Sequence, residues 1–348
     1  MDFNQSPLLV IWEVTKACDL TCSFCRDSVR PDADPNELST QEGYDLLNQV
    51  KEFGNPLLVL SGGDPLKRPD IFDLAARSVA IELRTNITPS PTPLLTGDAI
   101  ARFQQCGISR MAMSLDAPDS PTQDRIRGSE GTYERALSAL QHARAIGLET
   151  QVHTTVTRGN LATLGHIAEQ VADVQARMWS LFFPVRAGCA MEEDLTAQEY
   201  EKVFEFLFEI SKVAPFEIKT TQALHYRRYI AQRLIAEHGG RGGANGRMLW
   251  RTRAVSDGSG FLFISHTGEI YPSGFLPISG GNVRFDSLVD VYQNGALFRN
   301  LRDETARRGK CGYCEFHKIC GGSRARAYAF AGDYLESDPR CVYQPAMV

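Results

Sequence analysis

The feature that most constrains this chain is a regular alternation of short apolar segments with amphipathic ones. Apolar runs of strand length recur through the first half, and segments with helical periodicity lie between them. The expected strands are Leu8–Val14, Leu57–Ser61, Ile81–Thr85, Ile108–Leu115, Glu149–Val156 and Met178–Phe183. The expected helices are Thr40–Phe53, Ile71–Ala80, Thr96–Cys106, Thr132–Ile146 and Asn160–Val174. This order predicts an α/β fold whose parallel sheet closes, at least partly, into a six-stranded TIM-like barrel with helices outside.

The pattern changes after Pro184. Leu195–Val213 and the basic segment Ala223–His238 are expected to be helices, and the glycine-rich run 239–243 a flexible linker or lid. A strand–turn–strand from Phe261 to Pro272 then opens a small α+β domain. We therefore expect a barrel over 1–190, a helical linker over 191–255 and a second domain over 256–348.

Composition narrows the class of protein. The chain of 348 residues has a net charge of −5, 43% hydrophobic and 23% charged residues, and no basic block, so nucleic acid is not the expected partner. The sequence shows neither a signal peptide nor a membrane-spanning stretch, which predicts a cytoplasmic protein with no membrane partner. Seven of its nine cysteines fall into two clusters, which in a reducing compartment indicates metal ligands.

The first cluster, Cys18, Cys22 and Cys25, follows the first strand and so lies at the mouth of the predicted barrel. Three cysteines within eight residues can ligate three irons of a four-iron cluster and leave the fourth iron open. A zinc site or buried thiols are the alternative interpretation, but no fourth ligand for zinc stands nearby before Asp27.

The stretch from Cys18 to Cys25, with Phe24 before the last cysteine, resembles the signature of radical S-adenosylmethionine (SAM) enzymes. Gly62, Gly63 and Asp64, which end the second strand, resemble the turn that meets the SAM amino group; most relatives carry Glu in place of this Asp. The glycines would let the backbone approach the ligand, and the acid would pair with its ammonium.

Two further segments resemble elements of the same family. Ser114 and Asp116, at the end of the fourth strand, match an element beside the SAM ribose and carboxylate, although Ala117 replaces its final glycine. Arg127, followed by Gly128, matches the arginine that binds the SAM carboxylate, which a guanidinium fits bidentately.

The second cluster, Cys311, Cys314, Cys320 and Cys341, resembles the C-terminal SPASM domain, which carries auxiliary iron–sulfur clusters. A full SPASM domain ligates two such clusters. At the two places where the first of them needs cysteines, this chain has Ser273 and Ser323, and serine is a poor iron ligand. We therefore expect two four-iron clusters in all, one catalytic and one auxiliary; a four-cysteine zinc knuckle is the alternative.

Substrate contacts are predicted in a basic segment. Lys219, His225, Arg227 and Arg228 could clamp carboxylates, and Cys189, just after the last barrel strand, could meet a thiophilic atom. The runs Ser273–Pro277 and Gly321–Ala327 look most like the haem-biosynthesis branch of SPASM proteins, which act on tetrapyrrole propionates.

The resemblance implies reductive cleavage of SAM to a carbon radical that modifies a small molecule, with an electron donor such as flavodoxin or ferredoxin as partner. Three alternatives stay open. They are transfer of the 3-amino-3-carboxypropyl group of SAM to a thiophilic acceptor such as trivalent arsenic, maturation of a peptide, and a non-enzymatic zinc protein.

Overall fold

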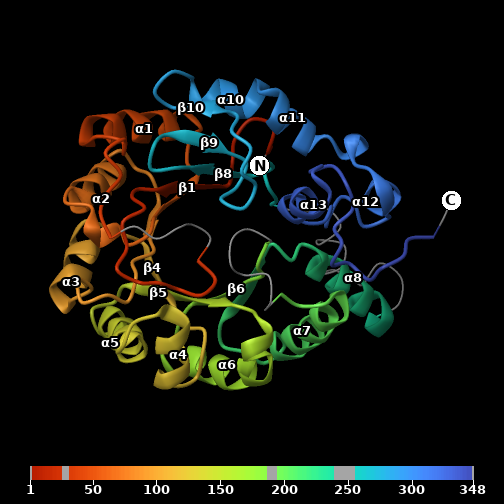
Figure 1. Ribbon diagram of the computed structural model, residues 1–348, viewed down its shortest axis with the longest axis horizontal. Coiled ribbons are helices and arrows are strands. Elements are labelled where there is room, and N and C mark those ends of the chain that lie inside the picture. The colour runs from red at the N-terminus through yellow and green to blue at the C-terminus, as the bar shows by residue number, and fades with distance from the viewer. Residues whose placement is uncertain (1, 26–30, 186–193, 239–254, 347–348) are drawn as a thin grey trace.

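A curved sheet surrounded by helices forms the body of the protein (Figure 1). The computed structural model describes residues 2–25, 31–185, 194–238 and 255–346. Within them the sheet has ten strands in the order β10-β9-β8-β1-β2-β3-β4-β5-β6-β7. The stretch from β8 to β7 is parallel throughout, whereas β9 and β10 are antiparallel additions. The expected partial barrel is confirmed.

The strands are β1 Leu9–Glu13, β2 Leu57–Ser61, β3 Thr85–Ile87, β4 Arg110–Ser114, β5 Glu149–Thr155, β6 Met178–Phe182, β7 Glu217–Thr221, β8 Phe261–Ile264, β9 Glu269–Tyr271 and β10 Gly281–Asn282. The helices around the barrel are α1 Thr40–Glu52, α2 Ile71–Ala80, α3 Gly97–Gln105, α4 Ser120–Arg127, α5 Thr132–Ala145, α6 Leu164–Asp173, α7 Ala197–Ile210 and α8 His225–His238. Those of the C-terminal part are α10 Leu288–Asn294, α11 Ala296–Arg302, α12 Gly309–Tyr313 and α13 Arg324–Ala331.

The strands place different side chains on their two faces. Outward-facing residues such as Trp12 and Trp179 are fully buried against the helices. Gly43 of α1 leaves room for the Trp12 ring, because a β-carbon there would lie 2.8 Å from its Cη2. The inward face of β5 is only half-buried and carries polar residues, so the inner side of the curved sheet, called the lumen face below, is polar at this strand.

Two expectations need correction. The third strand is Thr85–Ile87 rather than Ile81–Thr85, because Ile81 ends α2 and the chain turns at Glu82 with φ +61°. The segment 191–255 is not only helical, since β7 pairs with β6. The sequence of β7, Glu-Ile-Lys-Thr-Thr, contains a single apolar residue. A strand at the end of the sheet pairs with one neighbour only, so β7 lacks the apolar run of the central strands.

The C-terminal part is continuous with the barrel. β8 extends the sheet by pairing in parallel with β1, and residues of α8 and α12 line one cavity. No helix among the described residues is long and apolar enough to cross a membrane.

Candidate radical SAM site

The loop that carries Cys18, Cys22 and Cys25 is fastened to the glycine turn after β2. The amide of Gly63 donates to the Thr15 carbonyl at 2.8 Å, and the amide of Asp64 donates to the Ala17 carbonyl at 2.7 Å. A β-carbon on Gly63 would lie 2.5 Å from the same Ala17 carbonyl oxygen. The glycines are thus required for contact between the two loops, in addition to any approach to a ligand.

Asp64 is engaged by the protein around it. Its carboxylate is fully buried and accepts hydrogen bonds from the Thr92 hydroxyl at 2.6 Å and from the Leu66 amide at 3.1 Å. The protein thus engages this carboxylate, and its direct pairing with the SAM ammonium stays a prediction. Asp64 holds the turn in place.

The other side of the cysteine loop rests on the end of α4. The amides of Thr21 and Ser23 donate to the carbonyls of Arg127 and Ile126, at 3.1 and 2.9 Å. Gly128 ends α4 with φ +65°, and a β-carbon there would overlap Thr21. The loop is therefore positioned by both β2 and α4 before any cluster binds.

Arg127 connects this loop to the end of β4. Its guanidinium pairs with the buried carboxylate of Asp116, lies 3.6 Å from the Cys22 sulfur and packs over the Phe24 ring. Its Nε is buried without a hydrogen-bond partner among the described residues, so a donor remains for a ligand. Burial alone would lower the pKa of Arg127, but Asp116 and Cys22 outweigh it and the group stays charged.

A lateral row of polar residues crosses the lumen face next to this site. Ser114, His153, Ser180 and Lys219 occupy matching register positions on β4, β5, β6 and β7. The Gln151 amide bonds both the His153 ring, at 2.8 Å, and the Ser180 hydroxyl, at 2.9 Å. The sequence interpretation missed Gln151, His153 and Ser180. The alternation of Gln151, His153 and Thr155 along one strand was the signal for them.

His153 is neutral at ordinary pH. Burial lowers its pKa to about 3, and the positive charges of Lys219 and Arg127 act in the same direction. A neutral imidazole has one N–H donor and one acceptor nitrogen, so in this position it can form a hydrogen bond with a ligand at the lumen face.

Lys219 and Arg227 form a pair of cations without anionic partners. Neither side chain makes a hydrogen bond or ion pair with the residues that the structure describes. Lys219 reaches solvent although protein surrounds it, and burial followed by the charge of Arg227 lowers its pKa. Burial lowers the pKa of Arg227 as well. Two neighbouring cations without anionic partners among the described residues favour an anionic ligand.

The late cysteines come together. Cys311, Cys314, Cys320 and Cys341 line one cavity in the C-terminal part. Burial raises the pKa of the Cys314 thiol to about 11, and the charges of neighbouring Cys311 and Cys341 contribute. The Cys314 thiol is therefore protonated at ordinary pH, and metal binding there must release its proton.

His225 and Arg228 line this same cavity with the late cysteines, and their role as substrate contacts stays a prediction. His225 is fully buried, and Arg228 binds Glu201 and Gln232. They follow Lys219 and Arg227 closely in sequence. The turn at Gln222 and the start of α8, however, point them to the other side.

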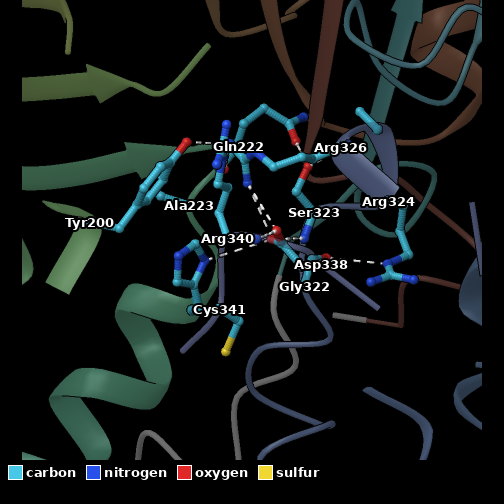
Figure 2. A network of polar contacts seen from close by, with 12 residues as sticks. Tyr200, Gln222, Ala223, Gly322, Ser323, Arg324, Arg326, Asp338, Arg340 and Cys341 are labelled. Carbon is cyan, nitrogen blue, oxygen red and sulfur yellow. Dashed lines mark hydrogen bonds and ion pairs between the residues drawn. The ribbon is translucent and has the colours of Figure 1, made fainter. Parts of the chain in front are cut away.

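A buried network joins the barrel to the C-terminal part (Figure 2). Arg326 pairs with Asp338 at 3.2 Å and donates to the Tyr200 hydroxyl at 2.8 Å and to the Gln222 carbonyl at 2.7 Å. Ser323 accepts the Arg326 amide as the N-cap of α13 and donates to the Gln222 side chain. This serine thus belongs to the joint between the two parts.

Some predictions fall outside the described residues, namely Cys189 and the glycine-rich run 239–243. Within the described residues, no three His, Cys, Asp or Glu side chains converge on the position of a single metal ion. A four-iron cluster does not require such convergence, because each of its cysteines binds a different iron.

Comparison with known proteins agrees with this geometry. The family model of the Radical SAM superfamily matches residues 12–171. AdoMet-dependent heme synthase of Oleidesulfovibrio alaskensis is 36% identical over 347 residues, which cover 99% of this chain and 89% of the relative. The protein of the same name from Methanosarcina barkeri is 35% identical and covers 98% of both chains. Fe-coproporphyrin III synthase of M. barkeri is 26% identical and covers 96% of this chain and 87% of its own.

Among solved structures, Streptococcus suis SuiB bound to the precursor peptide SuiA superposes with a TM-score of 0.75 and is 16% identical in sequence. The match covers 97% of this chain and 76% of SuiB and shows the shared fold. The near-full-length similarity to the heme synthases sets aside the non-enzymatic zinc alternative. This chain belongs to the radical SAM superfamily and is an enzyme of that superfamily.

Proposed function

We propose that this enzyme acts on a tetrapyrrole with propionate side chains in the formation of haem. The observation that carries the proposal is the 36% identity, over nearly the whole of both chains, to an AdoMet-dependent heme synthase. Peptide maturation has weaker support, because the likeness to the peptide-bound SuiB shows the fold alone. Group transfer to arsenic depended on Cys189, which lies outside the described residues.

Cys18, Cys22 and Cys25 would hold the catalytic four-iron cluster. When bound, the cluster and SAM supply one-electron cleavage of a carbon–sulfur bond and thereby a carbon radical. The backbone of Gly62 and Gly63 would face the SAM amino group. The spare Nε of Arg127 supports this residue as the ligand of the SAM carboxylate.

Two residues at the end of β4 would complete the SAM site. Asp116 accepts the Thr155 amide at 2.7 Å and holds Arg127 in position. Ser114 lies two residues before it, at the position expected beside the ribose. Asp64 would act through the turn that it stabilises.

The lumen wall would receive the substrate. Lys219 and Arg227 would bind propionate carboxylates, because these neighbouring cations have no anionic partner among the residues that the structure describes. His153 lies in the row between Lys219 and the residues of the SAM site, so it would donate a hydrogen bond to the bound tetrapyrrole. Substrate carboxylates would thus be held next to the source of the radical.

Cys311, Cys314, Cys320 and Cys341 would hold a single auxiliary four-iron cluster with no open iron. Their shared cavity supports this assignment. Ser273 and Ser323 stand where a second auxiliary cluster would need cysteines, which supports one auxiliary cluster. Ser323 instead donates a hydrogen bond to Gln222 between the barrel and the C-terminal part. The auxiliary cluster would take the surplus electron of the substrate, and a cytoplasmic flavodoxin or ferredoxin would supply the electron for SAM cleavage.

Anaerobic reconstitution followed by product analysis tests the function. We expect about eight irons per chain for two four-iron clusters. With an iron porphyrin that carries propionates, SAM should be cleaved to 5′-deoxyadenosine and the porphyrin should change in mass. Methylthioadenosine as the product would support group transfer instead.

The substrate site has its own test. The Lys219→Met, Arg227→Met double variant should raise the dissociation constant for the porphyrin at least tenfold, measured by its absorbance change on binding, and leave porphyrin-independent SAM cleavage intact. Lys202→Met, an exposed cation of α7, is the matched control. Unchanged porphyrin binding in the double variant would refute the proposed role of Lys219 and Arg227 in binding the substrate.

A further inference from the structure

His225 is a buried polar side chain in the cavity of the four late cysteines. It is fully inaccessible to solvent and packs against the rings of Tyr200 and Phe204, with centroids 5.1 and 4.8 Å away. The same cavity is lined by Cys311, Cys314, Cys320 and Cys341. Packing against two aromatic rings therefore holds this imidazole at the cavity of the four thiols.

Neither ring nitrogen of His225 has a hydrogen-bond partner among the described residues. Oδ2 of Asp338 lies 3.7 Å from Nδ1, which is beyond hydrogen-bond range. Asp338 is already satisfied, since it accepts the amides of Ser323 and Arg340 and pairs with Arg326. A buried donor without a partner is costly, so one is expected in the loaded protein.

The other polar side chains around the cavity are engaged. Lys310 donates to the carbonyl of Cys341, and Nδ1 of His317 bonds the carbonyl of Cys314 at 2.7 Å. The terminal nitrogens of Arg228 bind Glu201 and Gln232. Of the described polar side chains that line the cavity, His225 is the one with every polar atom unpaired.

We propose that His225 donates its ring N–H to a sulfur of the auxiliary cluster and raises the reduction potential of that cluster. The inference rests on the auxiliary cluster proposed above. Four thiolates occupy all four irons, so the cluster offers the imidazole acceptors and no open metal position. Reduction adds negative charge to the sulfurs, and a hydrogen bond to them therefore stabilises the reduced state more than the oxidised one.

The test is a potentiometric titration of the auxiliary cluster, followed by electron paramagnetic resonance in a Cys22→Ala background that removes the catalytic signal. His225→Phe keeps the ring and loses the N–H, whereas His225→Gln keeps a donor. At a fixed potential, the Phe variant should show about a tenfold lower ratio of reduced to oxidised cluster, a shift of about 59 mV for one electron. The Gln variant should recover most of this loss. His317→Phe, at the same cavity, should not change the ratio.

Iron and sulfide analysis accompanies every variant. About four irons per chain in the Cys22→Ala background are required for the auxiliary cluster; their absence there would defeat the cluster proposal itself. A normal iron content with an unchanged potential in His225→Phe would refute only the hydrogen bond. If His225→Phe does not load iron, pulsed resonance on ¹⁵N-histidine-labelled protein decides. Weak nitrogen coupling in the reduced cluster supports the bond, whereas strong coupling, which indicates ligation, or none overturns it.

Discussion

At the scale of single residues, Gly63 shows how much the catalytic loop depends on close backbone contact. Gly63→Ala would place a β-carbon 2.5 Å from the Ala17 carbonyl oxygen, and neither backbone can yield without moving the cysteine loop. We expect the variant to lose the catalytic cluster and to hold about four irons instead of about eight. Gly165→Ala in α6 meets no atom within 4 Å and should keep the full content. Full iron content in Gly63→Ala would contradict this prediction.

His153 makes stability depend on pH. Its pKa is about 3 in the folded protein and 6.5 in its ordinary state, so between these values the unfolded chain binds a proton that the folded one does not. The contribution is fully present above pH 6.5 and is lost as the pH falls toward 3. Urea unfolding at pH 7, 6 and 5 should show the wild type losing more stability than His153→Gln. Parallel losses would contradict a buried neutral imidazole.

Residues also differ in how far a sequence predicts them. Cys18, Cys22 and Cys25 are close because covalent spacing keeps them close, and their pattern alone suggested a cluster. Asp64 and His225 were assigned to ligands because their chemistry suits ligands. Asp64 contacts Thr92, and His225 lies at the cavity of the four late cysteines. These neighbours come from distant segments of the chain, so no local sequence pattern indicates the contacts.

At the scale of elements, hydrophobic periodicity predicted the strands and helices that pack against a core on one face. It failed at β7, which ends the sheet and faces a polar lumen, and so lacks a run of apolar residues. It also placed β3 too early, because the apolar residues at the end of α2 resemble a strand. Both failures occur where apolar character does not report strand pairing.

The first amides of helix α5 are capped by a side chain of α4, Asp124. The helix's own N-cap, Gly131, has no side chain, and Asp124 instead accepts the amides of Gly131, Thr132 and Tyr133 at 2.6 to 3.2 Å. Asp124→Ala should lower the free energy of unfolding by about 1–2 kcal/mol. Asp98→Ala, an exposed acid in the first turn of α3, should cost about 0.5 kcal/mol. Chemical denaturation measures both, and equal losses would argue against the shared cap.

At the scale of the whole molecule, the pair of Arg326 and Asp338 joins the barrel to the C-terminal part. Burial would raise the pKa of Asp338, but the charge of Arg326 outweighs it, so the pKa is lowered and the carboxylate stays ionised. Asp338→Asn leaves a buried guanidinium without its counter-charge, and we expect a loss of about 3–5 kcal/mol in chemical denaturation.

The matched control is Asp333→Asn, which breaks the exposed pair with Arg308. It should cost about 1 kcal/mol or less, because water screens and replaces that interaction. Similar losses in the two variants would mean that the joint contributes no more than a surface contact.

The parallel pairing of β1 with β8 has a consequence for biosynthesis. The ribosome makes β1 first, yet its partner on one side emerges only some 250 residues later, after every other parallel strand. Throughout translation the nascent barrel keeps an open edge at the strand that leads into the cysteine loop. Insertion of iron and sulfide into a finished site therefore comes after synthesis of the last quarter of the chain, and early termination should yield aggregation rather than a smaller working enzyme.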